Sequence, residues 1–227
     1  MSYFVTGTDT NVGKTLIGCA LLQGFAARGK RVVGMKPVAA GCDAEGQNDD
    51  VLKLRAAGNV EAAYGQLNPY CFQPAIAPHI AAQRAGVIIQ FSRIAESYKK
   101  LAAQADVVIV EGVGGFRVPL NEQQANAQQD SADLVQELDL PIILVVGIRL
   151  GCLNHALLTV EAIATRGLTL AGWVANIIEA DMPMHEENIA ALQQRIAAPL
   201  LGIVPYLQQA DARVVATRLN LYLLEQD

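Results

Sequence analysis

The sequence predicts a single α/β domain over residues 1–227, with a mostly parallel central sheet and helices on both of its faces. Apolar stretches of strand length alternate with stretches of helical length along the chain, the order typical of parallel strands joined by right-handed helical crossovers. Hydrophobic residues make up 52% of the chain and charged residues 17%, as expected for strands covered on both faces. No repeat, low-complexity linker or shift in composition indicates a second domain.

Strands are predicted where short apolar runs stop at a polar residue, a glycine or a proline. In chain order they cover residues 3–5, 31–35, 106–110, 141–147, 170–175 and a last run that ends at Pro205. The run at 141–147 is the most apolar, so we expect it at the centre of the sheet.

Helices are predicted between these strands from their length, periodicity and end signals. They cover residues 15–28, 48–57, 91–103, 130–138, 152–166 and 185–196. The first ends where Arg28 precedes Gly29, which suits a helix C-terminus, and the second opens on the acidic pair Asp49 and Asp50. The middle of the chain, around 68–79, is expected to be irregular, and 121–129 to be a polar, glutamine-rich loop.

A glycine-rich turn joins the first strand to the first helix and predicts a phosphate site. Gly7 and Gly13 permit backbone angles and a close approach that side chains would block, so that N–H groups can point at phosphate oxygens. Lys14 adds a full positive charge and Thr15 a hydroxyl for Mg²⁺. Five residues separate the glycines instead of the usual four, so the turn is a variant P-loop and the fold is P-loop NTPase-like. The alternative is an ordinary turn with an accidental Gly-Lys-Thr.

Three polar side chains stand where predicted strands stop, the edge at which open parallel sheets bind ligands. Lys36 is either a surface cation that contributes little to the core or a group that binds a phosphoryl group as it moves. Glu111 is either a solvated carboxylate or a group near Mg²⁺. Asn176 is either a turn residue or a donor and acceptor for the adenine edge.

Two further stretches have an open interpretation. Asp49 and Asp50 either complement the dipole of the helix they begin, or one of them completes the oxygen shell of the metal. Residues 149–155 form a turn entering a helix, which is either a plain helix start or a second anion site for a substrate carboxylate. From the residues alone, the chain is an ATP- and Mg²⁺-dependent phosphoryl transferase or ligase with an anionic co-substrate.

Charge and cysteine usage exclude several classes of protein. The net charge is -5 and no run of basic residues exceeds two, so neither nucleic acid nor an anionic membrane is expected as the principal partner. The four cysteines, Cys19, Cys42, Cys71 and Cys152, contain no Cys-x-x-Cys pair, and we expect reduced thiols. No leader and no apolar stretch of membrane-spanning length is visible, so a cytoplasmic location is expected.

Several stretches together resemble the dethiobiotin synthetase family, and the resemblance extends along nearly the whole chain. The matching stretches are 7–10 with 12–15, 36–39, 68–70, 78–79, 111–112 with 114–115, 151–155, 172–176 and 199–202. The first is shared with other enzymes, whereas the set is specific. The resemblance implies an ATP-driven closure of the ureido ring of dethiobiotin from 7,8-diaminopelargonate (7,8-diaminononanoate) and CO2, through a carbamate and a carbamic-phosphoric mixed anhydride, in biotin biosynthesis.

The same resemblance implies a role for individual residues. Lys14 and Lys36 would be catalytic. Mg²⁺ would be held by Thr15, Asp50 and Glu111. ATP would contact Asn11, Val12, Gly13, Lys14, Thr15, Leu16, Asp50, Glu111, Gly112, Val113, Gly114, Asn176, Val204, Pro205 and Tyr206. Substrate would contact Thr10, Lys36 and Ala40, and its carboxylate would lie across a homodimer interface at Gly151, Cys152, Leu153 and Asn154.

Four positions depart from the family pattern and bear on affinity. Asn11 stands where glutamate is common, Ala40 replaces a serine that contacts substrate, Asn188 replaces a tyrosine near the substrate carboxylate, and Gln209 replaces a glutamate near the ribose. Three alternatives compete with this interpretation. One is a paralogue that keeps the fold but has lost tight binding of diaminopelargonate, which Ala40 and Asn188 would allow. Cobyrinate-amidating enzymes carry an additional glutaminase domain, for which 227 residues leave no room, and septum-positioning ATPases carry an extra lysine near the start of the phosphate loop, where this chain has Thr8 and Asp9.

Overall fold

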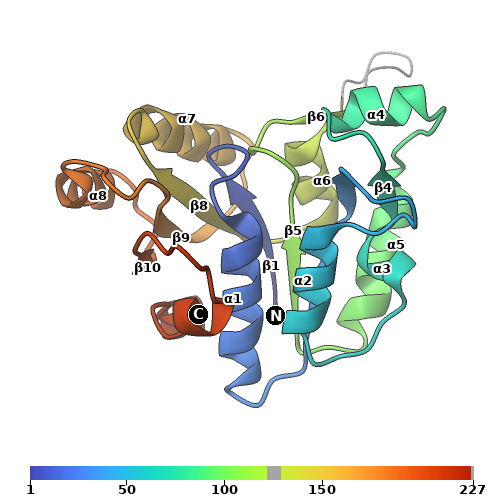
Figure 1. Ribbon diagram of the computed structural model, residues 1–227, viewed down its shortest axis with the longest axis horizontal. Helices are drawn as coiled ribbons and strands as arrows, with labels where there is room; N and C mark the ends of the chain where they lie inside the picture. Colours follow the sequence, from blue (N-terminus) through green and yellow to red (C-terminus); the bar gives the residue numbers. More distant parts are fainter. Residues whose placement is uncertain (122–128, 226–227) are drawn as a thin grey trace.

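The computed structural model describes residues 1–121 and 129–225, and its core is a six-stranded parallel sheet (Figure 1). The strands are β1 (Ser2–Gly7), β2 (Val32–Met35), β5 (Val107–Glu111), β8 (Ile142–Ile148), β9 (Leu170–Ile177) and β10 (Leu200–Val204). Their spatial order is β10-β9-β8-β1-β5-β2, and every neighbouring pair is parallel. The predicted fold class is confirmed, and the most apolar strand, β8, lies inside the sheet between β9 and β1.

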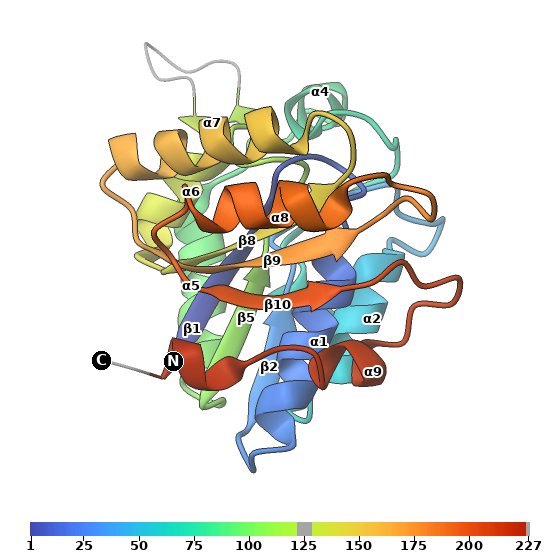
Figure 2. The ribbon, with the colours of Figure 1, turned by 90° about the vertical axis from the view of Figure 1, so that its left-hand side faces the viewer.

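Helices cover both faces of this sheet (Figure 2). One face carries α1 (Lys14–Ala26), α2 (Asp49–Ala57), α9 (Ala212–Ala216) and the 3-10 helix η1 (Leu221–Leu224). The other carries α5 (Phe91–Ala102), α6 (Ser131–Leu138), α7 (Cys152–Thr165) and α8 (His185–Gln193).

The alternation of side chains along the central strands explains this division. In β1, Val5 packs on the face of α1, whereas Phe4 packs on the opposite face. In β8, Val145 packs with α1 and Leu144 with α7 and α8. Because both faces are apolar, the polar groups of the domain gather at the ends of the strands.

The middle of the chain is more regular than the sequence indicates. It contains α3 (Tyr64–Leu67), β4 (Tyr70–Phe72) and α4 (Pro78–Arg84), and β4 pairs in parallel with β3 (Val38–Ala40). The prediction of an irregular region was wrong because elements of three to seven residues are too short to show a clear period. The glutamine-rich loop lies largely outside the described residues, and its ends belong to the antiparallel pair β6 (Pro119–Asn121) and β7 (Gln129–Asp130).

The prediction of four reduced thiols is corrected for two of the cysteines. Cys42 and Cys71 form a disulfide, with their Cα atoms 6.2 Å apart, that joins the segment after β3 to β4. The two cysteines are close because β3 and β4 pair in parallel, and the sequence analysis did not predict this pair of strands. Cys19 and Cys152 are free and buried, and burial raises the pKa of the Cys19 thiol to about 12, which keeps it protonated.

Candidate active site

The glycine-rich loop has the conformation expected of a phosphate cradle. Gly13 has a φ of +94°, in the left-handed region, and a Cβ atom there would lie 2.3 Å from Nδ2 of Asn176. Asn11 also has a positive φ, of 60°, a conformation that asparagine tolerates better than most other residues. The side chain of Lys14 folds back over the loop, and its Nζ donates to the carbonyl oxygen of Asp9 at 2.8 Å. The loop is therefore formed without a ligand.

Beside the loop, three elements bring a lysine and two carboxylates together. Lys36 follows β2, Glu111 ends β5 and Asp50 lies in the first turn of α2. Lys36 Nζ donates to Glu111 Oε1 at 2.5 Å and to Asp50 Oδ2 at 3.0 Å. Thr15 Oγ1, at the start of α1, donates to Glu111 Oε1 at 2.9 Å. Of the two acidic residues that open α2, the structure selects Asp50, whereas Asp49 is exposed.

Lys36 and Glu111 are the buried members of this cluster, whereas the Asp50 side chain is 38% exposed. The sequence left the burial of Lys36 open. Lys36 is 5% exposed and Glu111 only 1%, so neither is a surface charge. Asn68 helps to hold the lysine, because its Nδ2 donates to the carbonyl oxygen of Lys36 at 2.6 Å. Sequence reasoning gave no role to Asn68; its only signal was the Asn-Pro pair after α3.

The pKa values of the two lysines move in opposite directions. Burial lowers the pKa of Lys14 to about 8, only partly opposed by Glu111 and reinforced by the charge of Lys36. Burial also opposes the charged form of Lys36, but the Glu111 and Asp50 carboxylates outweigh it and raise the pKa of Lys36. Burial raises the pKa of Asp50, yet its pairing with Lys36 lowers that pKa overall. Lys36 is therefore a fixed cation at neutral pH.

The donor set of this cluster fits a hard divalent cation. Glu111 Oε2 is buried and has no hydrogen-bond partner among the described residues. An unpaired buried carboxylate oxygen is costly, and it is relieved by a cation. A hydroxyl oxygen from Thr15 and a second carboxylate from Asp50 complete a set of hard oxygen donors, the type that Mg²⁺ prefers.

A cavity of about 890 Å³ opens over the loop and the charged cluster. Eleven of the predicted site residues line it: Thr10, Asn11, Gly13, Lys14, Thr15, Lys36, Ala40, Asp50, Glu111, Val113 and Gly114. Sequence reasoning missed the others: Asp9, Ala75, Ile76, Ala77, Pro78, Gly115 and Val118. The 75–78 wall comes from the middle region, whose structure the sequence did not predict.

Ala40 contributes less to this cavity than its position suggests. Alanine has no polar side-chain atom, so only its backbone could bind substrate. The carbonyl oxygen of Ala40 already accepts a hydrogen bond from Asn48 Nδ2 at 3.3 Å. Asn188, another departure from the family pattern, lies on α8 and donates to the carbonyl oxygen of Met184 at 2.8 Å.

Asn176 has a second task besides the one predicted for it. Its Nδ2 donates to the carbonyl oxygen of Val12 at 2.8 Å, and the side chain is buried. The amide therefore ties β9 to the phosphate loop from beneath Gly13. The amide oxygen and the second N–H of Nδ2 are left to face a ligand.

Some predicted residues lie outside the cavity. Val12 is buried under the loop, Gly112 adjoins Phe4, and Leu16 faces a separate hollow between α1, α2 and α9. Val204 is the last residue of β10, and Pro205 and Tyr206 follow it; of the three, only Val204 is buried. Gly151, Cys152, Leu153 and Asn154 form the start of α7, with Gly151 at a φ of +91°. The structure thus gathers the predicted phosphate and metal residues around one cavity, whereas residues 151–154 and 204–206 are not among those that line it.

Comparison with known proteins finds similarity over most of the chain. The model of a family described as an AAA domain matches residues 1–214. The ATP-dependent dethiobiotin synthetase BioD of Aromatoleum aromaticum is 54% identical over 223 residues, which cover 97% of each chain. That of Nitrosospira multiformis is 54% identical over 219 residues, which cover 96% of this chain and 94% of the relative.

Solved structures with low sequence identity share the fold. A MinC:MinD cell division protein complex from Aquifex aeolicus contains a chain with a TM-score of 0.56 and 14% identity, covering 99% of this chain and 88% of that one. The septum site-determining protein MinD from Pyrococcus horikoshii, solved with Mg-ADP, has a TM-score of 0.51 and 15% identity, with coverage of 100% and 90%. At these identities the likeness concerns the fold alone.

Proposed function

Because the chain belongs to the ATP-dependent dethiobiotin synthetase family, we propose that this ligase closes the ureido ring of dethiobiotin from 7,8-diaminopelargonate and CO2, at the expense of ATP. The observation that carries the proposal is Lys36, a buried cation fixed between Glu111 and Asp50 beside a phosphate loop. A reaction that transfers a phosphoryl group to a carboxylate-like oxygen needs fixed positive charge at that place.

The reaction would run in three steps with balanced atoms. One amine of the substrate adds to CO2 and loses a proton, giving a carbamate. A carbamate oxygen then attacks the γ-phosphorus of ATP, and ADP leaves, giving a carbamic-phosphoric mixed anhydride. Finally the second amine attacks the carbamoyl carbon, loses a proton, and expels inorganic phosphate as the ring closes. Phosphorylation is needed because carbamate oxygen is otherwise a poor leaving group.

The chain's own residues would position and neutralise the reacting groups. Lys14 and Lys36 would bind carbamate and phosphate oxygens, and Thr10 would lie between substrate and nucleotide. Thr15, Asp50 and Glu111 would hold Mg²⁺, which when bound neutralises phosphate charge. Lys36 pairs with both carboxylates and would hold them in position.

Two further groups of residues would bind the ends of the substrates. The free amide oxygen of Asn176 suits the amino group of adenine, with residues 204–206 beside it. The start of α7 at 151–154 would take the substrate carboxylate across a homodimer interface. Two exposed leucines support a partner subunit there: Leu150, just before α7, is 91% exposed, and Leu158, within α7, is 57% exposed.

The partners would be small molecules in the cytoplasm. In the described part of the chain, no helix has the length and apolarity needed to cross a bilayer. The net charge of -5 supports the view that the phosphates are bound locally by the loop and its lysines, and that nucleic acid is not a partner.

The test is mass spectrometry of a reaction that contains the purified protein, ATP, Mg²⁺, bicarbonate and 7,8-diaminopelargonate, with each component omitted in turn. We expect a product heavier than the diamine by one carbonyl and lighter by two hydrogens, formed only in the complete mixture. If ADP forms without the diamine and no such product appears, the substrate assignment is wrong, although the nucleotide site stands.

A further inference from the structure

An ion pair connects the phosphate loop to the turn that precedes α7. Asp9 Oδ2 and Arg149 Nη2 are 2.5 Å apart, although 140 positions separate them in the sequence. They meet because β1 and β8 are parallel neighbours, with Gly7 opposite Val145. The segments that follow these two strands therefore leave the sheet at the same edge. We propose that Arg149 is a positioning residue for ATP binding: it neutralises and fixes Asp9, and through Asp9 the phosphate loop. The proposal rests on the nucleotide site proposed above.

Two of the acceptor atoms of Asp9 accept hydrogen bonds from the phosphate loop. Its Oδ1 accepts from the backbone N–H of Thr10 at 2.7 Å, and its carbonyl oxygen accepts from Lys14 Nζ at 2.8 Å. Oδ2 is left for Arg149. A change in the orientation of Asp9 therefore moves the group that holds Lys14 in the free enzyme.

The loops carrying the two partners are also joined by backbone contacts. The N–H of Thr8 donates to the carbonyl oxygen of Val145 at 3.0 Å, and the N–H of Gly147 donates to Thr8 Oγ1 at 3.4 Å. Farther along, the N–H of Cys152 donates to the carbonyl oxygen of Arg149 at 3.0 Å. Arg149 thus lies on a continuous path from the phosphate loop to the start of α7.

Charge gives the pair its role in binding. Asp9 lines the same cavity as Lys14 and Thr15, so an unpaired carboxylate there would face the phosphates of a nucleotide. Like charges at such a distance oppose binding, and the guanidinium removes that opposition. Both side chains are partly exposed, at 45% for Asp9 and 34% for Arg149, so the expected effect is moderate.

The experiment measures the dissociation constant of a fluorescent, non-hydrolysable ATP analogue with Mg²⁺, in wild type, Arg149→Met, Asp9→Asn and the double variant. We expect Arg149→Met to weaken binding about fivefold when Asp9 is present, and less than about twofold in the Asp9→Asn background. Arg149→Lys, which keeps the charge, should bind within about twofold of wild type. This assay needs no diamine, so its outcome does not depend on the identity of the second substrate.

A matched control uses another exposed pair, Arg31 with Asp106, whose Nη2 and Oδ1 atoms are 2.8 Å apart at the opposite edge of the sheet. Arg31→Met should leave the dissociation constant unchanged. The proposal is overturned if Arg149→Met has no effect, or if it weakens binding equally with and without Asp9, since the arginine would then contact the nucleotide directly. A loss in Arg149→Lys equal to that in Arg149→Met would also overturn it.

Discussion

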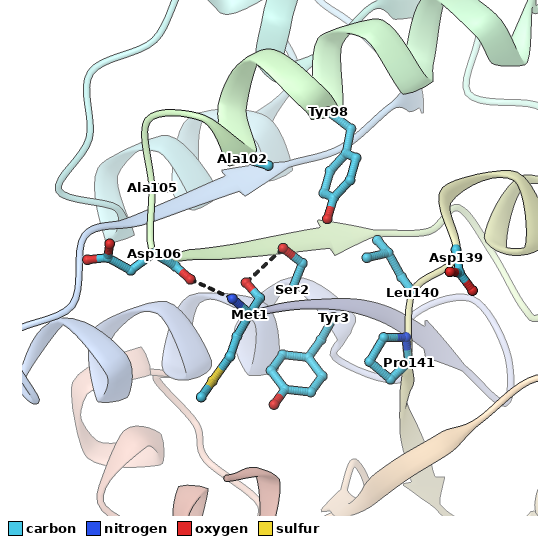
Figure 3. Close-up of a pocket in the computed structure, with 10 residues that line it drawn as sticks. All are labelled: Met1, Ser2, Tyr3, Tyr98, Ala102, Ala105, Asp106, Asp139, Leu140 and Pro141. Atoms are coloured by element: carbon cyan, nitrogen blue, oxygen red, sulfur yellow. Dashed lines mark hydrogen bonds between the residues drawn. The ribbon is translucent and has the colours of Figure 1, made fainter. Parts of the chain in front are cut away.

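The sheet has a carboxyl edge, where its parallel strands end, and an amino edge, where they begin. Each edge carries an ion pair and a cavity, but the charged side chains are buried at the first and exposed at the second. At the carboxyl edge, Lys36 and Glu111 are buried at 5% and 1% exposure beneath a cavity of about 890 Å³. At the amino edge, the Arg31 and Asp106 side chains are 62% and 39% exposed. Asp106 also lines a cavity of about 440 Å³ (Figure 3). Buried charges are expensive and exposed ones are not. Of these two ion pairs, only Lys36 with Glu111 is buried, so its position requires an explanation beyond the stability of the fold.

The hydrogen bonding of the two carboxylates sharpens this contrast. Asp106 uses both oxygens, which accept from the backbone N–H, Nε and Nη2 of Arg31. In Figure 3 its carbonyl oxygen also accepts from the N-terminal amine of Met1, at 2.8 Å. Glu111, by contrast, leaves Oε2 buried without a hydrogen-bond partner among the described residues. The carboxylate at the amino edge thus has its hydrogen bonds satisfied within the protein, whereas the carboxylate at the carboxyl edge has one oxygen left for a ligand.

The largest test of this contrast is Lys36→Met. We expect turnover to fall by at least about a thousandfold, because the cation beside the moving phosphoryl group is lost. Unfolding free energy should also fall, by about 3–5 kcal/mol, since Glu111 is left buried and uncompensated. Steady-state ring closure and chemical denaturation measure the two effects. Arg31→Met, the matched change at the amino edge, should retain wild-type turnover; near-normal turnover in Lys36→Met would contradict the contrast.

The second test is Glu111→Gln, which keeps the size of the side chain and removes its charge. Turnover should fall by about a hundredfold, and the Mg²⁺ concentration for half-maximal activity should rise, because the amide is a poorer metal ligand. A titration of activity with Mg²⁺ separates the two effects. Asp106→Asn is the control and should leave the titration unchanged. An unaltered Mg²⁺ requirement in Glu111→Gln would remove Glu111 from the metal site.

A third test compares the two glycines that flank α1, one at each edge. Gly13→Ala would place a Cβ 2.3 Å from Asn176 Nδ2, whereas Gly29→Ala meets nothing within 4 Å, although both positions have positive φ. Both should lose about 1–2 kcal/mol of stability from backbone strain. Only Gly13→Ala should weaken nucleotide binding, by about tenfold, because the loop must shift. Equal nucleotide affinity in the two variants would show that the loop tolerates displacement.

At the carboxyl edge, the sequence predicted residues from the ends of single strands and helices. It did not predict contacts between residues that are far apart in the sequence. Lys36 and Glu111 were singled out because each stands at the end of a predicted strand, and parallel topology brings such positions together. The start of α2 left Asp49 and Asp50 as alternatives, and only the family resemblance indicated Asp50. The contact between Asp9 and Arg149 escaped prediction because it depends on which strands are neighbours, and strand order is not written in any local pattern.

The missed features of the middle region have the same origin. The disulfide of Cys42 with Cys71 requires the short β3–β4 ladder, whose three-residue strands carry too little periodicity to be recognised. The sequence also left open whether Lys36 is buried, since a strand-end lysine is buried or exposed according to what packs over it. Here Asn68 and α2 do so, and both come from other parts of the chain.

The smallest expected effect concerns the amino edge alone, and it is a pH dependence. The side-chain and backbone hydrogen bonds from Arg31 lower the pKa of Asp106 to about 2, from an ordinary value near 3.8. A depressed folded-state pKa stabilises the fold above the unfolded-state pKa, and this contribution is lost as pH falls toward the folded-state pKa. The stability difference between wild type and Asp106→Asn should therefore be constant above about pH 5 and shrink between about pH 4 and 2. Denaturation curves at several pH values measure it, with turnover at neutral pH equal in both proteins. A difference that persists unchanged at pH 2, or a loss of turnover, would mean that the amino edge does more than hold the fold together.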